Sequence, residues 1–381
     1  MSGFSRTLEN RTRQALVAAI SLLAIAVVLP RSVSSHETVN TTVLFDREIV
    51  RVLNSHCVMC HVEGGPSFPL ATYEDVWLQR RKISAAVIAR HMPPWPAISG
   101  YGRFANENAV TLRESQFIVS WMEGLGPRNS GKVFTNTSDP SAPKTAAVRA
   151  HADFSAWPIG APDVVRELDP VVVEANQPDD VKRVTIDLGL TTQRDVRAVE
   201  YLPGDRRVVR AAFFTVQETG QWLGTWTPWY GFTKLPEGVA FRLPAGSHVV
   251  AEIHYQHVKD RIVDRGRLGL VVGALGAKTA SDLVLDLKEL RAEATLSADT
   301  TVLALGPEVT PGVTSLEVKA RRPDGGTDVL LFAKDFSPKW PTPFVLAEPI
   351  VLRRGTVLSA VAHASDASAR ARLRILLTRQ N

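Results

Sequence analysis

The sequence predicts a multidomain protein in which an all-α domain is followed by all-β sandwiches. Residues 45–56 carry apolar side chains at helical spacing, and two further helical segments follow before residue 127. After about residue 153 the pattern changes to short strand-like runs separated by turn residues. The length of 381 residues also exceeds what one compact core usually uses, so several domains are expected.

The first 35 residues predict a targeting segment. Three arginines among residues 6–13 precede the uncharged apolar run Ala15–Leu29, and small residues follow it as in a cleavage site. The run is short for a helix that must cross about 30 Å of hydrocarbon. A cleaved signal peptide is favoured, with an uncleaved membrane tether and a buried helix as alternatives. Either of the first two places the rest of the chain in the periplasm or otherwise outside the cytoplasm.

Composition and charge exclude some classes of protein. Hydrophobic residues make up 45% of the chain and charged residues 22%, which are ordinary globular values. The formal net charge is +5, but the first 35 residues alone hold four arginines against one glutamate. The remainder is therefore close to neutral, and no nucleic-acid partner is expected.

The segment Cys57-Val58-Met59-Cys60-His61 has the C-x-x-C-H pattern of covalently bound haem. Thiols one helical turn apart can each reach a haem vinyl group, and the following imidazole can bind the iron. A zinc site would need a second pair of ligands, yet the chain has only two cysteines. A redox C-x-x-C should follow a strand, whereas a helical pattern precedes this one. We expect one haem c, with Cys57 and Cys60 as thioethers and His61 on the iron.

The other axial ligand is expected to be Met92. Prolines follow it directly in Met92-Pro-Pro-Trp-Pro and hold the chain extended, so that a stiff loop can present the thioether. His91 is an alternative ligand, and an open site is another. Met122 falls on the apolar face of a helical segment and is better explained as core.

These patterns divide the chain. Residues 36–127 are expected to form a mono-haem cytochrome c domain with further helices over about 73–90 and 111–123, and residues 128–152 form a linker rich in Ser, Thr, Asn, Pro and Ala. Four apolar residues are candidates for packing against haem: Phe68, Leu70, Trp95 and Trp121. Seven later runs fit strands: 183–188, 208–216, 249–255, 268–272, 314–320, 329–332 and 357–362.

Several passages are similar to those of a known group of bacterial proteins: Met92-Pro-Pro-Trp-Pro, Tyr101-Gly-Arg-Phe-Ala-Asn-Glu-Asn, Trp157-Pro-Ile-Gly-Ala-Pro-Asp, Leu235-Pro-Glu-Gly-Val, Leu243-Pro-Ala-Gly-Ser and Glu252-Ile-His-Tyr. The chain resembles proteins that join a mono-haem cytochrome to a module like the copper type II, ascorbate-dependent monooxygenases, which include peptidylglycine α-hydroxylating monooxygenase and dopamine β-monooxygenase. The resemblance implies two jelly-roll-like sandwiches, over 153–260 and 261–381. In active members they hold two copper ions between them.

The resemblance also implies that the copper ligands are largely lost here. Where active relatives carry a His pair, this chain has Val209-Arg210-Ala211-Ala212, and no methionine occurs after Met122. His254 stands in place, while His257 comes one position late for strand alternation. His254 is thus a candidate vestigial copper ligand, with a plain surface or core histidine as the alternative. A working copper site is not expected.

The expected function is to carry single electrons between redox protein partners in the periplasm. The β-module would then serve in docking or scaffolding, and no catalytic residue is assigned. Two alternatives remain: a copper-dependent monooxygenase fed by its own haem, and a subunit of a larger periplasmic oxidoreductase.

Overall fold

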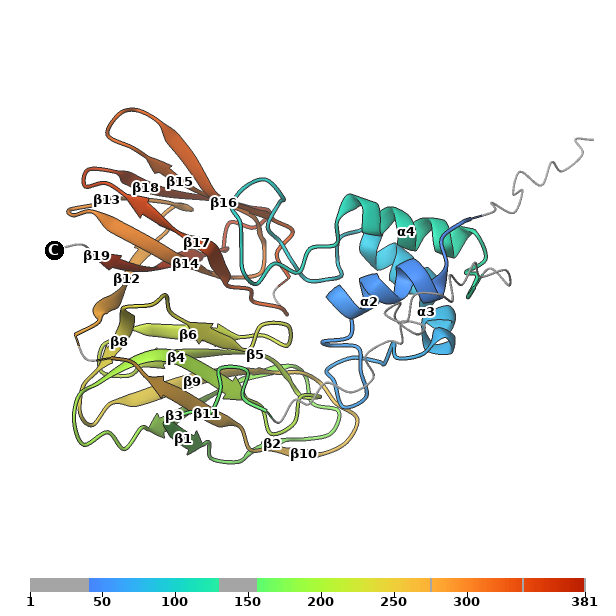
Figure 1. Ribbon diagram of the computed structural model, residues 1–381, viewed down its shortest axis with the longest axis horizontal. Helices are drawn as coiled ribbons and strands as arrows, with labels where there is room; N and C mark the ends of the chain where they lie inside the picture. The colour runs from blue at the N-terminus through green and yellow to red at the C-terminus, as the bar shows by residue number, and fades with distance from the viewer. Residues whose placement is uncertain (1–40, 130–155, 275, 338, 380–381) are drawn as a thin grey trace, which may run out of the picture.

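The computed structural model describes residues 41–129, 156–274, 276–337 and 339–379, and most of their regular structure is β-strand (Figure 1). The expected targeting segment and all but the first two residues of the expected linker lie outside the described residues. Within the described ranges, no helix has both the length and the apolar character that a membrane crossing requires.

The helices form one small cluster at the right of Figure 1. Capping boxes explain where two of them begin, because the Thr72 and Thr111 side chains accept from the backbone three residues on, at Asp75 and Glu114, whose carboxylates accept in return. All three predicted helical segments are found at their predicted places. Their bounds are η1, a π-helical turn, Phe45–Ile49; α2 Val50–His56; α3 Tyr73–Ile88; and α4 Leu112–Glu123.

Aromatic rings hold this helical cluster together. The Phe45 ring packs edge-on against Tyr73 at 5.2 Å between centroids and lies 6.0 Å from that of Trp121. The Phe45 amide donates to the carbonyl oxygen of Pro127 at 3.0 Å, so the start and the end of the helical region meet. Buried residues of η1, α2, α3 and α4 form the core.

The prediction of an all-α cytochrome domain over residues 36–127 is wrong. The three α-helices are short, with 7, 16 and 12 residues, in a chain that is mainly β-sheet. Residues 89–111 connect α3 to α4, and their middle part, residues 93–109, which we call the strap, leaves the helices. Its Trp95, Ala97 and Phe104 are buried in the core of a β-sandwich. Packing in this core removes the apolar surface of these side chains from water, which stabilises the strap on the sandwich.

The first sandwich lies at the lower left of Figure 1. One four-stranded sheet packs on part of a longer sheet around a shared apolar core. The strands of the first sheet are β3 Asp180–Asp187, β9 His248–Tyr255, β5 Val209–Val216 and β6 Trp222–Trp226. Opposite them are β1 Val164–Glu167, β11 Arg267–Val272, β4 Arg194–Leu202, β8 Val239–Leu243 and β7 Phe232–Lys234, with a small pair at one end, β2 Val171–Val173 and β10 Ile262–Asp264.

The second sandwich lies above the first in the same view. Its separate sheet has the order β13 Arg291–Thr295, β18 Val357–Ala364, β15 Val313–Arg321 and β16 Thr327–Lys334. The facing strands are β12 Lys278–Asp286, β19 Ala371–Arg379, β14 Thr300–Val309 and β17 Phe344–Leu352. All seven predicted strand runs are therefore found, and the prediction of β-sandwiches is confirmed.

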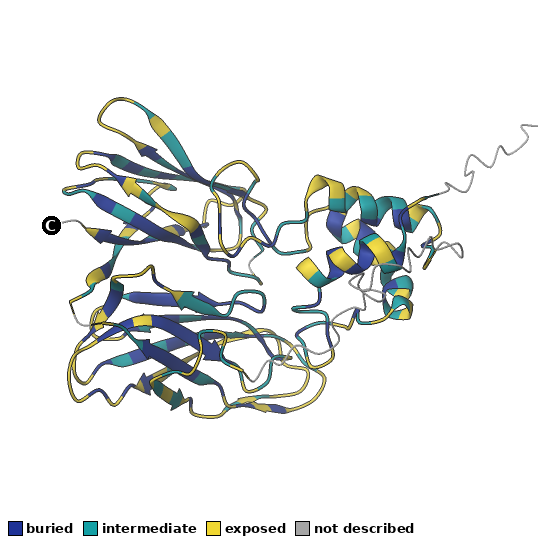
Figure 2. Ribbon diagram, in the orientation of Figure 1, coloured by how far each residue is buried: buried dark blue, intermediate teal, exposed yellow. Residues whose placement is uncertain are grey.

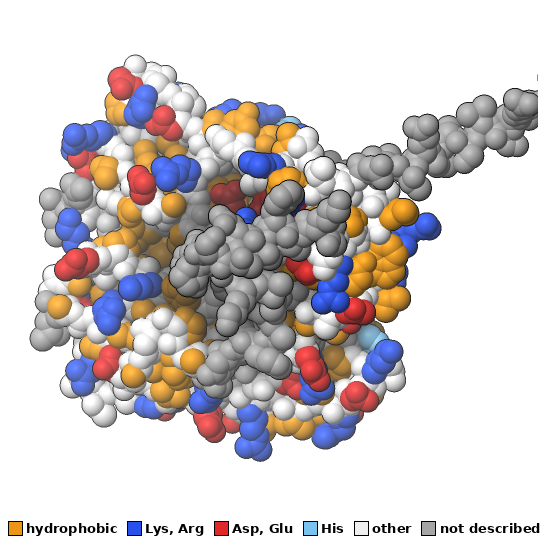
Figure 3. All heavy atoms as spheres, turned by 45° about the vertical axis from the view of Figure 1, so that its right-hand side comes forward, with side chains coloured by type: hydrophobic (Ala, Val, Ile, Leu, Met, Phe, Trp, Pro, Cys, Tyr) orange, Lys and Arg blue, Asp and Glu red, His pale blue; other side chains and the backbone are white. Residues whose placement is uncertain are grey.

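One sheet runs through both sandwiches. β8 pairs in parallel with β12, where Lys278 lies opposite Val239, and among the described residues this pairing joins five strands of the first sandwich and four of the second into a single nine-stranded sheet. Buried residues are concentrated on the strands of both sandwiches (Figure 2), and they form one apolar core in each. Strands β10 and β11 follow residue 260 but pack with the first sandwich. On the visible outer face, acidic and basic side chains are interspersed (Figure 3).

The strap ties the helical cluster to the second sandwich. Ala97 forms a bridge with Ala333 of β16, and Phe104 forms one with Leu346 of β17. The side-chain amide of Asn106, which is buried, donates to the carbonyl oxygen of Pro343 at 2.7 Å. The helices therefore have a fixed position relative to the sandwiches.

Candidate functional site

The segment Cys57–His61 follows α2 without a break. The Cys57 amide donates to the Leu53 carbonyl at 2.9 Å, and the Cys57 carbonyl accepts from Cys60 at 3.1 Å and from His61 at 2.9 Å. These bonds wind the segment into one more turn. The two thiols are free and partly buried, and both belong to this single turn.

Both cysteines are held as neutral thiols. Burial raises the pKa of Cys57 to about 12, with the neighbouring Cys60 and Glu114 adding to the rise. Burial also raises the pKa of Cys60 to about 12, against the opposing effect of the Arg206 charge. A redox C-x-x-C depends on a thiolate with a lowered pKa. Here burial raises the pKa of both cysteines, which disfavours the thiolate.

The His61 imidazole has a fixed orientation. Its Nδ1 lies 2.9 Å from the carbonyl oxygen of Phe68, and the Phe68 ring packs edge-on against it at 4.7 Å between centroids. A carbonyl oxygen can only accept, so Nδ1 carries the proton and Nε2 presents its lone pair. Burial lowers the pKa of His61, which favours this neutral form. Metal-binding histidines are commonly oriented by such a bond from the other ring nitrogen.

This donor set fits covalent haem. Two thiols on one turn suit thioether bonds, and a neutral imidazole with a free Nε2 suits an axial iron ligand. The sequence did not predict the hydrogen bond between His61 and the carbonyl oxygen of Phe68. Phe68 itself was among the candidates for packing against haem.

Met92 and His91 lie just beyond the C-terminus of α3. The amides of both donate to the carbonyl oxygen of Ala86, at 3.3 Å for Met92 and 2.8 Å for His91, and the peptide bond after Met92 is cis. Both side chains are exposed. Exposure does not distinguish the two side chains, so both remain candidates for the other axial position.

Three of the four candidates for packing against haem belong to the helical cluster. Phe68 is exposed beside His61, while Leu70 and Trp121 are buried among the helices. Trp95 is different, because it lies in the core of the second sandwich. Its expected packing against haem is replaced by contacts with other aromatic rings of that core.

Two residues of the first sandwich donate hydrogen bonds to the backbone of the C-x-x-C-H motif and of the loop that follows it. Arg206 Nη2 donates to the carbonyl oxygen of Met59 at 3.2 Å, and Gln256 Nε2 donates to that of Pro66 at 2.6 Å. Sequence reasoning missed both. The partners are far apart along the chain, and no local pattern marks such contacts.

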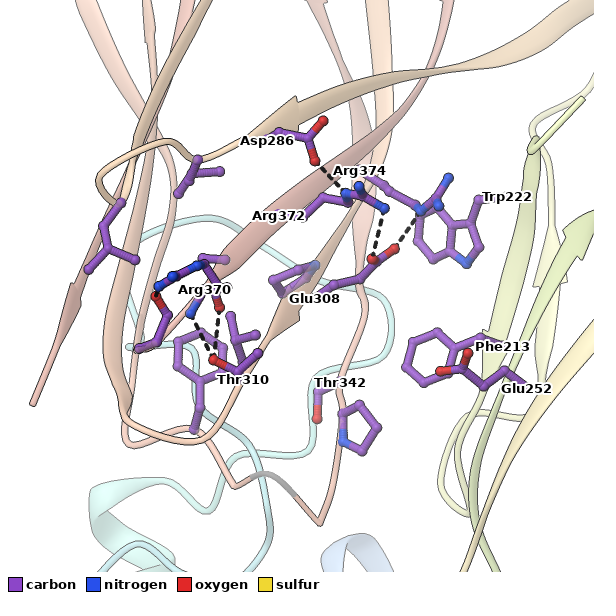
Figure 4. Close-up of a pocket in the computed structure, with 18 of the residues that line it drawn as sticks. Phe213, Trp222, Glu252, Asp286, Glu308, Thr310, Thr342, Arg370, Arg372 and Arg374 are labelled. Carbon is purple, nitrogen blue, oxygen red and sulfur yellow. Dashed lines mark hydrogen bonds and ion pairs between the residues drawn. The ribbon is translucent and has the colours of Figure 1, made fainter. Parts of the chain in front are cut away.

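A cleft of about 1490 Å³ separates the two sandwiches (Figure 4). Phe213, Trp222 and Glu252 line it on the side of the first sandwich. Charged side chains line the opposite wall, where Glu308 on β14 pairs with Arg372 at 3.7 Å and with Arg374 at 2.5 Å. Arg372 and Arg374 therefore share the carboxylate of Glu308.

His254 projects from β9 into this cleft. Its Nε2 lies 3.5 Å from a carboxylate oxygen of Glu252, and its ring centroid is 5.4 Å from that of Phe213. The His254 imidazole, together with Arg183, lowers the pKa of Glu252 to about 2. Among the described residues that line the cleft, His254 is the only histidine and there is no methionine or cysteine.

The other residues compared with copper ligands lie elsewhere. His257 follows β9, and its Nδ1 bonds the carbonyl oxygen of Gln177 at 3.0 Å. Arg210 pairs with Asp179 at 2.6 Å. In the part of the chain that the structure describes, no group of three or more His, Cys, Asp or Glu side chains is arranged to hold a metal ion.

Comparisons with known proteins add little to this geometry. The sequence matches no family model and no curated protein. Among solved structures, the major capsid protein P2 of bacteriophage PM2 is 10% identical with a TM-score of 0.24, and the match covers 56% of this chain and 98% of that one. The 7S globulin of Momordica charantia is 11% identical with a TM-score of 0.15, covering 56% and 79%. At such TM-scores these similarities carry no argument.

Proposed function

We propose that this protein carries single electrons through one covalent haem c, attached at Cys57 and Cys60 and bound at the iron by His61. The observation that carries the proposal is the hydrogen bond between His61 Nδ1 and the Phe68 carbonyl oxygen, in a C-x-x-C-H segment. This bond supports the role because it fixes the tautomer and leaves Nε2 available for a metal.

The bound group supplies an iron that takes up and releases one electron. The residues of the chain attach it, orient it and set its surroundings. Cys57 and Cys60 anchor it, and the turn that joins them sets the distance between the two anchors. Met92 is the proposed second axial ligand, with His91 as the alternative. The protein is proposed to act outside the cytoplasm with redox protein partners, and the sandwiches provide a rigid support.

The copper-dependent alternative finds less support. A site that cycles between Cu(I) and Cu(II) needs several imidazole and thioether donors converging on one ion. His254 is engaged with Glu252 in a cleft wall where the other described residues offer no second donor of either kind. We therefore propose no catalytic residue, and no role of His254 beyond a vestigial one.

An optical redox titration tests the proposal. The protein is produced with its N-terminal segment in a host that matures c-type haem outside the cytoplasm, and spectra are recorded at stepped potentials. We expect the bands of one low-spin haem that titrate as a single one-electron transition. A purified protein without haem bands, or with slopes that require more than one electron, would refute the proposal.

A further inference from the structure

The loop between β4 and β5 is held rigidly beneath the C-x-x-C-H segment. Asp264 is buried, and its carboxylate accepts from the Asp205 amide at 2.8 Å and from the Tyr255 hydroxyl at 2.8 Å. The Tyr201 hydroxyl lies 3.4 Å from the same carboxylate. These bonds fix the backbone of the loop at the position from which Arg206 projects.

Arg206 reaches from this loop to the C-x-x-C-H segment. Its Nη2 donates to the carbonyl oxygens of Met59 at 3.2 Å and of Pro228 at 2.9 Å. The guanidinium also lies 5.4 Å from the centre of the buried Trp226 ring. Met59 is one of the two residues between the cysteines, so Arg206 bonds the backbone of the motif itself.

Gln256 forms a second link to the same segment. Its Nε2 donates to Pro66 and to the carbonyl oxygen of Arg207, and its Oε1 accepts from Arg210 Nε at 3.0 Å. Arg210 is in turn paired with Asp179. The first sandwich is therefore bonded to Met59 within the motif and to Pro66 in the loop after it, through side chains that are themselves held by neighbours.

We propose that Arg206 is a positioning residue of the haem-binding segment, which holds this segment on the first sandwich and, through its fixed charge beside Cys60, raises the reduction potential of the attached haem. The inference rests on the proposed function. Fe(III) haem carries one more positive charge than Fe(II) haem, so a partly buried cation next to the attachment site destabilises the oxidised form more. Burial lowers the pKa of Arg206 to about 10, which still leaves it charged at neutral pH.

The test compares midpoint potentials of matured full-length variants. Arg206→Gln removes the charge, and Arg207→Gln is the matched control, because the adjacent Arg207 is exposed and pairs with Asp205. Both variants change the net charge of the protein equally. We expect Arg206→Gln to shift the Fe(III)/Fe(II) ratio at a fixed potential about tenfold toward Fe(III), which is about 59 mV for one electron. Arg207→Gln should shift it far less, and Arg206→Lys should stay near wild type.

Equal potentials for wild type, Arg206→Gln and Arg207→Gln would overturn the inference. Haem bands in these proteins would still agree with the proposed function, so failure of the inference is distinguishable from failure of the proposed function. If Arg206→Gln retains no haem, limited proteolysis of Arg206→Lys decides the matter. Lysine keeps the charge but lacks the guanidinium group whose Nη2 donates to both carbonyl oxygens. Faster cleavage within residues 57–68 than in wild type supports a positioning role. Unchanged cleavage contradicts it.

Discussion

The Trp95 ring packs edge-on against the Phe344 ring, with 5.3 Å between centroids and 74° between planes. Trp95 lies on the strap next to the helices, whereas Phe344 begins β17 of the second sandwich. The contact makes the strap part of the sandwich core. The connection between α3 and α4 is thereby tied to the second sandwich.

Trp95→Ala should destabilise the second sandwich. The side chain is 8% exposed, and removing a buried tryptophan costs about 3–5 kcal/mol in the free energy of unfolding. Chemical denaturation followed by circular dichroism of the β-sheet signal measures it. Tyr101→Ala is the control on the same strap, because Tyr101 is 42% exposed and should cost less than about 1 kcal/mol. Equal losses for the two variants would argue against a core role of the strap.

Met92→Ala should remove the second axial ligand. Sulfur coordination gives a weak far-red band in the oxidised spectrum, and this band should disappear in the variant. The potential should fall, because a thioether ligand raises it. His91→Ala is the matched control, since both residues are exposed beyond α3. A wild-type spectrum without this band, together with ligation that changes in His91→Ala but not in Met92→Ala, would assign the ligand to His91.

Glu200 should make stability depend on pH. It is 2% exposed on β4, and burial raises the pKa of its carboxyl group to about 7, although the Ile159 amide donates to it at 3.0 Å. The folded state therefore binds the proton more tightly than the unfolded state, and stability falls as pH rises from about 4.5 to about 7. With about 1.4 kcal/mol for each tenfold change, the loss is on the order of 3 kcal/mol.

Glu200→Gln should flatten this dependence, because an amide does not titrate. Unfolding by denaturant at several pH values between 4.5 and 7.5 measures it, with the exposed Glu237→Gln as the control. If Glu200→Gln and Glu237→Gln show the same slope of stability against pH, the carboxyl group of Glu200 is not the cause.

Copper should bind weakly or not at all in the cleft. Among the described lining residues, His254 alone offers an imidazole, and its Nε2 is 3.5 Å from Glu252. Calorimetric titration of the matured protein with copper should give no stoichiometric, tight binding and no change in His254→Ala. Tight binding of one or two equivalents, with ascorbate-dependent oxygen uptake that His254→Ala abolishes, would favour the monooxygenase alternative.

The regular elements were predictable because local patterns determine them. The capping residues Thr72 and Thr111 and the apolar spacing of residues 45–56 mark helices, and alternation marks strands such as β9. The packing of the strap against the second sandwich could not be predicted. Trp95 looks the same in sequence whether it packs on haem or on Phe344, and the choice depends on contacts between distant segments.

The same distinction holds for the site. Cys57, Cys60 and His61 are defined by a spacing of a few residues, which is a local signal. Arg206 and Gln256 bond this segment from the first sandwich, through backbone carbonyl oxygens that any residue could provide. Sequence patterns of a single chain carry no trace of such pairs.

The most direct test of covalent haem is a denaturing gel stained for haem peroxidase activity. Protein matured outside the cytoplasm should give a stained band at the position of the chain, because thioether bonds survive denaturation. Replacing Cys57 and Cys60 together by alanine should abolish the band, since His61 alone cannot retain the group, while Met59→Ala between them should keep it. An unstained wild-type band, or a band that persists in the double variant, would contradict covalent haem at this segment.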